Sequence, residues 1–151
     1  DDLSRGLGDV YKRQDIKICN DTEWQKNHLK SIQISYRSSP YFEFFEDYFY
    51  EIFEKKEKFL IDINIKSIEL IFQILELELN YSFTKKYKAE YHLTNDLRNI
   101  SDRKRVETKN AIQSYPQVFD NRHGHIQNLS MLDLIFNEGI GCLNFFNESK
   151  I

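Results

Sequence analysis

Three consecutive stretches between residues 21 and 77 repeat apolar side chains at the spacing of an α-helix, and this pattern constrains the fold most strongly. Residues that recur every three or four positions share one face of a helix, and that face packs on a core. The three stripes consist, in chain order, of Trp24, His28, Ile32 and Tyr36, of Phe42, Phe45, Phe49, Ile52 and Phe53, and of Ile65, Ile68, Ile71, Phe72 and Leu75. The sequence therefore predicts three core helices.

Polar residues with capping ability indicate where the first two helices begin. Asp21 or Thr22 is expected to cap the first helix, which then runs to about Arg37. Ser39 is expected to be the N-cap of the second helix, because Pro40 suits the first helical position. The two helices are therefore expected to follow one another with almost no linker.

The rest of the helical expectation concerns residues after the second stripe. Residues 59–64 are expected to form a short extended connector, and the third helix is expected to continue to about Leu77. The segment Ser130–Asp133 has the pattern of a capping box that opens a short helix. Gly139 is expected to end that helix in the αL conformation, and the apolar turn of residues 142–146 is expected to dock on the core.

Two short segments alternate apolar and polar residues and are expected to be extended. Ile16 and Ile18 alternate within residues 15–19, which predicts the last strand of a sheet. Residues 114–119 also alternate, but Pro116 confines them to a sheet edge or a turn. The predicted fold is α+β and predominantly helical, with three core helices and short strands from a truncated N-terminal sheet.

The first fourteen residues are expected not to belong to the folded domain. Residues 9–14 are the translation of GAT GTG TAT AAG AGA CAG, the end sequence of a transposase used to fragment DNA for sequencing. Segments of this kind are excluded from fold reasoning. Residues 1–14 are therefore expected to be an artefactual tail, and residues 15–151 the C-terminal part of a single domain.

Composition indicates a globular chain and excludes several classes of protein. Aromatic residues make up 15% of the chain and the net charge is −3, which is not the composition of a disordered segment. Cys19 and Cys142 are far apart and have no CxxC partner, which favours a reducing cytoplasm. No apolar run approaches the length of a membrane span, and no P-loop, dinucleotide-binding or nucleophile-elbow motif occurs.

Residues 84–113 form a basic stretch with eight Lys and Arg against four Asp and Glu. One interpretation is a solvated surface insert, as charge runs usually are. The other is a phosphate-binding surface, in which Arg103, Lys104 and Arg105 would attract the diphosphate of a nucleotide-activated donor. Nucleic acid is not expected as a partner, because the whole chain is acidic and lacks a recognition motif.

His28 and His123 are the candidate catalytic residues. His28 lies in the first apolar stripe, where a histidine is either a half-buried core residue or a general base near Ser31 or Tyr36. His123 precedes a glycine in a turn-rich loop. Both interpretations of His28 stay open at the level of sequence.

His123 and His125 stand two residues apart, and Asp120 or Asp133 could add a carboxylate to them. Zinc and iron sites use such ligands, but they require a larger cluster than this pattern offers. No metal site is therefore predicted, and the sequence does not indicate which cofactor, if any, the protein uses.

Polar residues concentrate between Tyr115 and Asp133, where they either bond and cap the loop or recognise the hydroxyl groups of a sugar. The candidate substrate-binding residues are Trp24, Tyr36, Tyr115, Gln117, Asn128 and Asp133.

Two blocks of the sequence resemble the WbqC-like protein family. The first consists of Trp24-Gln25-Lys26-Asn27-His28, Ser31-Ile32, Tyr36-Arg37 and Pro40-Tyr41-Phe42-Glu43. The second consists of Tyr115, Gln117, Val118, Phe119, His123, Gly124, Asn128, Leu129, Ser130, Asp133, Leu134, Phe136, Asn137 and Gly139. The chain departs from the family pattern at His125, Gln127 and Ile140, and it lacks the motifs of the family's N-terminal part.

The resemblance implies a role in bacterial O-antigen and other surface-polysaccharide biosynthesis in the cytoplasm. One function that it suggests is acyl or aminoacyl transfer to a nucleotide-activated amino sugar. The alternative is a non-catalytic protein that binds a sugar nucleotide or holds partner enzymes of the same pathway. If the family's N-terminal motifs carry catalytic groups, these residues alone are expected to be inactive.

Overall fold

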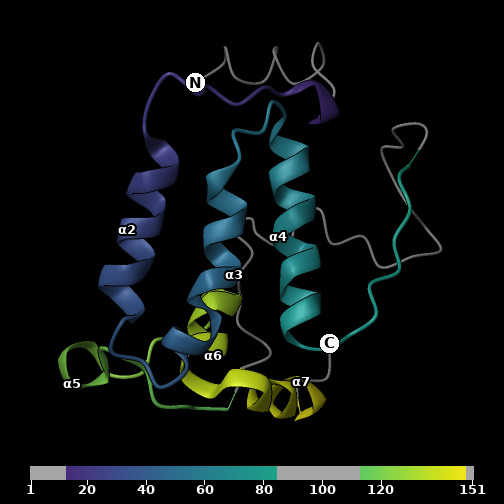
Figure 1. The fold of residues 1–151 in the computed structure, drawn as a ribbon. Helices are drawn as coiled ribbons and strands as arrows, with labels where there is room; N and C mark the ends of the chain where they lie inside the picture. Colours follow the sequence, from purple (N-terminus) through teal and green to yellow (C-terminus); the bar gives the residue numbers. More distant parts are fainter. Residues whose placement is uncertain (1–12, 85–112, 149–151) are drawn as a thin grey trace, which may run out of the picture.

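A computed structural model describes residues 13–84 and 113–148, and within them the chain is predominantly helical, as expected. Figure 1 shows three long helices side by side, with shorter helices gathered across the lower end of the group. The elements in chain order are η1 (Arg13–Asp15), α2 (Trp24–Tyr36), α3 (Phe42–Glu54), α4 (Leu60–Ile74), α5 (Asp120–His123), α6 (Met131–Glu138), η2 (Gly139–Cys142) and α7 (Leu143–Glu148). The three expected core helices are α2, α3 and α4. No helix in the described residues is both long and apolar enough to cross a membrane.

The core is centred on one phenylalanine of α6. Phe136 is fully buried, and its ring lies 5.1 Å from Tyr36, 5.1 Å from Phe42 and 5.2 Å from Phe49, measured between ring centroids. These partners come from α2 and α3, so α6 closes the lower end of the helical group. Aromatic rings at such distances add specific contact energy to the burial of their area. The apolar stripes of α2 and α3 therefore meet on a residue of a third helix.

The expected N-caps of α2 and α3 were wrong. α2 begins at Trp24 and no side chain caps it. α3 begins at Phe42, because Ser39 and its neighbours form a tight turn instead of a first helical turn. In that turn the Ser39 hydroxyl donates to the Tyr36 carbonyl at 2.6 Å. Ser39 therefore closes the preceding helix and leaves the next helix uncapped by a side chain.

The predicted strand of residues 15–19 is not present. Its first residue belongs to η1, and Lys17 forms only an isolated antiparallel bridge with Phe59. No strand of two or more bridged residues occurs in the described part, where residues 113–117 are irregular. An extended segment needs a neighbour to form a ladder, and here it pairs at one position with the linker before α4. The α+β class is therefore not confirmed.

The third helix differs from the expectation at both ends and in its buried face. α4 starts at Leu60, so the linker before it is shorter than predicted, and it stops at Ile74. Glu76 has a positive φ of 54°, which ends the helical path before Leu77. Ile68 was expected to face inward but is 51% exposed, whereas Leu70 and Ile74 are buried. The inward face is therefore turned slightly from the predicted stripe.

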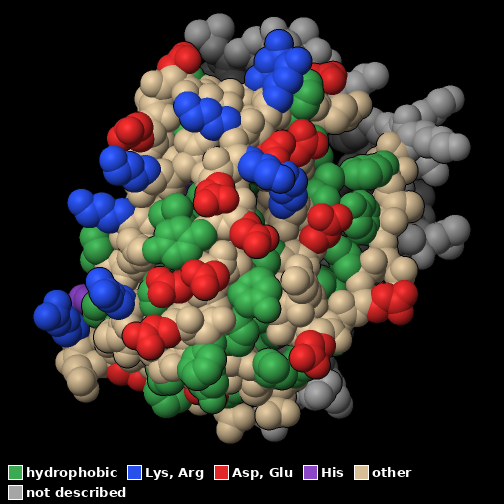
Figure 2. Space-filling model, viewed as in Figure 1, with side chains coloured by type: hydrophobic (Ala, Val, Ile, Leu, Met, Phe, Trp, Pro, Cys, Tyr) green, Lys and Arg blue, Asp and Glu red, His purple; other side chains and the backbone are tan. Residues whose placement is uncertain are grey.

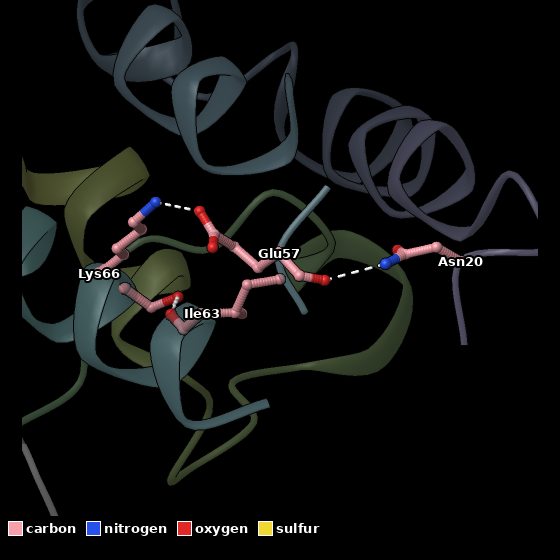
Figure 3. A network of polar contacts seen from close by, with 5 residues as sticks. Asn20, Glu57, Ile63 and Lys66 are labelled. Atoms are coloured by element: carbon pink, nitrogen blue, oxygen red, sulfur yellow. Dashed lines mark hydrogen bonds and ion pairs between the residues drawn. The ribbon is translucent and has the colours of Figure 1, made fainter. Parts of the chain in front are cut away.

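Polar contacts attach the segment before α2 to the linker between α3 and α4. Figure 3 shows the Asn20 amide donating to the Glu57 carbonyl, at 2.9 Å, while the Glu57 carboxylate pairs with Lys66 of α4. The Asn20 side-chain oxygen accepts from Trp24 Nε1 at 3.3 Å and from Gln25 Nε2 at 3.4 Å. Asn20 therefore fixes the start of α2 at one end of the helical group, and α6 closes the other end.

The C-terminal elements follow the sequence prediction more closely. Gly139 ends α6 with a φ of +58°, but its ψ of −138° lies outside the expected αL conformation, and a Cβ atom at this position would lie 2.8 Å from the Tyr41 ring. The close contact and the positive φ both require glycine here. The expected apolar turn also docks on the core, since Cys142 is fully buried and Phe145 contacts the Tyr115 ring at a centroid distance of 5.6 Å.

Candidate functional site

A buried carboxylate in the first turn of α6 brings together two tyrosines that are distant in the sequence. Asp133 is 4% exposed and accepts a hydrogen bond from the Tyr115 hydroxyl at 2.7 Å. Tyr36, at the end of α2, interacts electrostatically with the same carboxylate, whose charge acts on its hydroxyl. Burying a charged group requires hydrogen bonds that replace water, and the Tyr115 hydroxyl provides one. We call Tyr36, Tyr115 and Asp133 the tyrosine–aspartate cluster.

The cluster replaces the capping box that Ser130–Asp133 was expected to form. Ser130 does occupy the N-cap, but its side chain makes no capping bond and Asp133 hydrogen-bonds to tyrosines. The Asp133 amide still donates to the Ser130 carbonyl at 3.0 Å, as in the first turn of a helix. The sequence pattern thus located the helix start correctly and assigned its carboxylate to the wrong partner.

Both tyrosine pKa values in the cluster are shifted upward. Burial, followed by the charge of Asp133 and a hydrogen bond to it, raises the pKa of Tyr36 to about 12. Burial, followed by the hydrogen bond to Asp133, also raises the pKa of Tyr115. Both hydroxyls are therefore protonated at neutral pH and act as donors to the carboxylate. Neither tyrosine is suited to accept a proton from a substrate.

These shifts predict a loss of stability at alkaline pH. A tyrosine in the unfolded chain ionises near pH 10, and Tyr36 in the folded chain near pH 12, so the stabilisation is complete below about pH 10 and is lost as the pH rises from there towards about 12. Urea unfolding of the wild type should show a falling free energy across this window. The fall should be smaller in a Tyr36→Phe, Tyr115→Phe double variant. Identical slopes in the two proteins would contradict this assignment.

A glutamine closes the loop that follows Tyr115. The Gln117 side chain accepts from the Ile126 amide and donates to the Ile126 carbonyl, both at 2.8 Å. The backbone N–H of Gln117 also donates to the carboxylate of Asp120, the first residue of α5, at 2.8 Å. Gly124 ends α5 with a φ of +67°, which returns the chain toward Tyr115. Gln117, predicted to bind substrate, therefore acts as a clamp that shapes the loop.

The closed loop forms one wall of a pocket beside the cluster, with a volume of about 160 Å³. The residues that line it are Tyr115, His125, Gln127, Asn128, Leu129, Ser130, Met131 and Leu134. The His125 ring meets the Tyr115 ring edge-on, at a centroid distance of 5.3 Å. His125 Nδ1 is buried, and it has no hydrogen-bond partner within the described part of the chain. A buried polar atom without a partner is uncommon and marks a place where a ligand could bond.

The lining of the pocket limits what it can hold. It combines amide, hydroxyl and imidazole groups with apolar side chains, and among the described residues its lining contains no Lys, Arg, Asp or Glu. Its volume of about 160 Å³ is well below the roughly 300–1,000 Å³ of pockets that enclose a whole drug-sized ligand. An uncharged group such as a sugar ring or a short acyl chain fits this chemistry, whereas a diphosphate does not.

The predicted catalytic histidines do not meet. His28 is exposed on α2, where its ring lies 5.3 Å from Trp24 and 6.0 Å from Phe53 between centroids. The half-buried core position, one of the two interpretations of His28, is therefore not seen, and the general-base interpretation stays a prediction. His123 is exposed at the end of α5, and neither histidine lines the pocket. In the described residues no group of three His, Cys, Asp or Glu could hold a metal ion, so His123 and His125 gain no further ligand.

The predicted binding residues fall into three places. Tyr36, Tyr115 and Asp133 form the cluster, and Asn128 lines the pocket with a positive φ of 58°. Trp24 lies with His28 near the start of α2, away from that group. The basic residues Arg103, Lys104 and Arg105 lie outside the described residues, so the phosphate-binding prediction stays untested.

The sequence analysis missed His125 and Gln127 as site residues. Both stand where the chain departs from the pattern of the resembling family, so the departure directed attention away from them. The one sign of them in the sequence was that both lie within the polar segment between Tyr115 and Asp133. That signal was insufficient, because only the Gln117 clamp turns His125 toward Tyr115.

Comparison with known sequences identifies one family. A sequence model described as the WbqC-like protein family matches residues 8–113. The match includes the first resembling block, around Trp24, and ends before Tyr115, so the pocket lies outside the matched residues. It begins within the first fourteen residues, and the boundary expected after residue 14 stays a prediction. No curated protein and no solved structure matches the chain.

Proposed function

The chain belongs to the WbqC-like protein family, and from this premise we propose that it binds the amino-sugar or acyl portion of a surface-polysaccharide precursor. The proposed site is the pocket beside the tyrosine–aspartate cluster. The observation that carries the proposal is the buried, unpartnered His125 Nδ1 at an uncharged polar wall. Sugar hydroxyls and amides offer the directional donors and acceptors that such a wall requires.

The reaction proposed for this site is acyl or aminoacyl transfer to an amino sugar. In such a transfer the amine nitrogen bonds to the acyl carbon, the bond from that carbon to the leaving group of the acyl donor breaks, and the proton lost by the amine passes through a base to the leaving group. The His125 imidazole is the pocket-lining group that can accept this proton, because both tyrosines of the cluster are held as donors. His125 thereby takes the role first expected of His28 and His123. The two cysteines are free, which supports a cytoplasmic site for the reaction.

A second candidate function is sugar binding without chemistry, as in a protein that holds a precursor for partner enzymes. One observation favours it. Among the described residues that line the pocket, Ser130 is the hydroxyl nucleophile candidate, and its side chain makes no hydrogen bond to His125. A hydrogen-bonded nucleophile and base are the usual mark of covalent catalysis. Direct transfer to a bound amine does not require that pair, so the first candidate keeps its mechanism.

Titration calorimetry with nucleotide-linked amino sugars tests the proposal. Replacing His125 with alanine should weaken binding about tenfold, as expected for one lost hydrogen bond to the ligand. His123→Ala is the matched control, because His123 is exposed, lies two residues away and does not line the pocket. Equal binding by the His125→Ala variant and the wild type would rule out this site. Binding that depends on His125 without product formation in the presence of an acyl donor would support the second candidate.

A further inference from the structure

Helix α3 presents an aromatic face to solvent. Tyr41, at its N-cap, and Phe44 and Tyr48, within it, are spaced i, i+3 and i+7, so they lie along one side. Their exposed fractions are 40%, 72% and 37%, and the Tyr41 and Phe44 rings lie 6.1 Å apart between centroids. We call these three residues the aromatic stripe. Contiguous exposed apolar groups on a helix commonly mark an interaction site.

The same helix is strongly acidic. Its five carboxylates, with no Lys or Arg in the helix, belong to Glu43, Glu46, Asp47, Glu51 and Glu54. All except Glu46 are exposed, and the ion pairs between described residues include none of them. Figure 2 shows a face on which hydrophobic side chains alternate with Asp and Glu, while most Lys and Arg lie toward its upper and left margins and one cationic group lies in its upper middle. The aromatic stripe therefore has an acidic border that the described residues do not neutralise.

This charge pattern lowers the stability of α3 as an isolated helix. Glu43 and Asp47, and likewise Asp47 and Glu51, are like charges at i and i+4, an arrangement that destabilises a helix. A cationic partner would remove that repulsion. Arginine and lysine also bind over the faces of aromatic rings, and their aliphatic stems cover apolar surface. The stripe and its border are thus complementary to one kind of partner in both charge and shape.

We propose that the aromatic stripe and its acidic border dock a segment of another protein that carries Arg or Lys among apolar side chains. A second copy of this chain would bring acidic helix against acidic helix, which electrostatics disfavours. Nucleic acids and anionic membranes are repelled for the same reason. The docking surface does not include residues of the pocket, so this proposal stands independently of the proposed function.

Fluorescence anisotropy with two labelled synthetic peptides tests the proposal on the whole chain. The first peptide is an amphipathic Arg/Leu sequence, and the second replaces each Arg by Glu. We expect the Arg peptide to bind, with an affinity that falls as salt is added, and the Glu peptide not to bind. A Phe44→Ala, Tyr48→Ala variant should bind the Arg peptide at least about tenfold more weakly. An Asp47→Asn, Glu51→Gln variant should bind it more weakly and with a flatter salt dependence.

Matched controls distinguish this surface from general attraction between an acidic protein and a basic peptide. Ile16→Ala and Asp21→Asn remove an exposed apolar group and an exposed carboxylate near the opposite end of the helical group. These controls should leave affinity unchanged. Losses equal to those of the α3 variants would overturn the proposal. Self-association of the wild type that the Phe44→Ala, Tyr48→Ala variant abolishes would also overturn it, by identifying a second copy as the occupant.

Discussion

Replacing Asp133 with alanine is expected to lower the free energy of unfolding by about 3 kcal/mol, because the buried Tyr115 hydroxyl loses its charged acceptor and Tyr36 loses its interaction with the same carboxylate. The Tyr115 hydroxyl donates to this carboxylate at 2.7 Å, and the charge of Asp133 acts on the Tyr36 hydroxyl. Tyr115 belongs to the buried core, and Tyr36 is partly buried against it. Urea or guanidinium unfolding at neutral pH measures the loss directly.

The Asp133→Asn variant is the matched control for charge. Asparagine keeps the volume and one acceptor oxygen, and hydrogen bonds to a neutral acceptor are roughly half as strong as those to a carboxylate. The variant should therefore lose roughly half as much stability as Asp133→Ala. Both substitutions should also lower the pKa of Tyr36 from its value of about 12, since the charge of Asp133 contributes to that shift. An Asp133→Ala protein as stable as the wild type would show that the cluster is not a stabilising element.

Replacing Phe136 with alanine is expected to lower the free energy of unfolding by about 3–5 kcal/mol, the range for a large aromatic residue removed from a packed core. Phe136 is fully buried and packs on rings from both α2 and α3. The cavity left by its side chain would separate α6 from the long helices. Because α6 also carries Asp133, the tyrosine–aspartate cluster should loosen at the same time, and binding in the pocket should weaken.

Phe44→Ala is the control for the loss of a phenyl ring. Phe44 belongs to α3 and is 72% exposed, so its replacement should change the free energy of unfolding by no more than about 0.5 kcal/mol. Comparing Phe136→Ala with Phe44→Ala tests the effect of burial, because the residue type removed is the same. Similar losses at both positions would mean that Phe136 is not the centre of the core.

Helical periodicity predicted most of the fold because the signal is local. The α3 stripe buried Phe42, Phe49 and Ile52 as the spacing indicates, whereas α4 differs from the expectation at both ends and in which side of its apolar surface is covered. The predicted strand failed because its pattern says nothing about a partner. Lys17 pairs at one position only, with Phe59 directly before α4. A strand depends on a neighbour that periodicity cannot supply.

The candidate site was predicted in part. Tyr36, Tyr115 and Asp133 were named as separate binding residues, and the structure brings both tyrosines to the Asp133 carboxylate. The candidate catalytic histidines, His28 and His123, were named for their sequence context, but the position of a histidine relative to a pocket depends on how its loop closes. The Gln117 clamp decides this for His125, and the sequence alone does not reveal such a side-chain to backbone bond.

The sequence by itself determined the three long helices, the glycine that ends α6 and the membership in the WbqC-like protein family. These depend on spacing along the chain and on residue types at single positions. Only the tertiary structure decided that Asp133 bonds to Tyr115 and lies beside Tyr36 from another distant segment, and that His125 lines the pocket. The physical reason is that a buried polar atom takes the partner that packing brings to it, and packing joins residues that no local pattern connects.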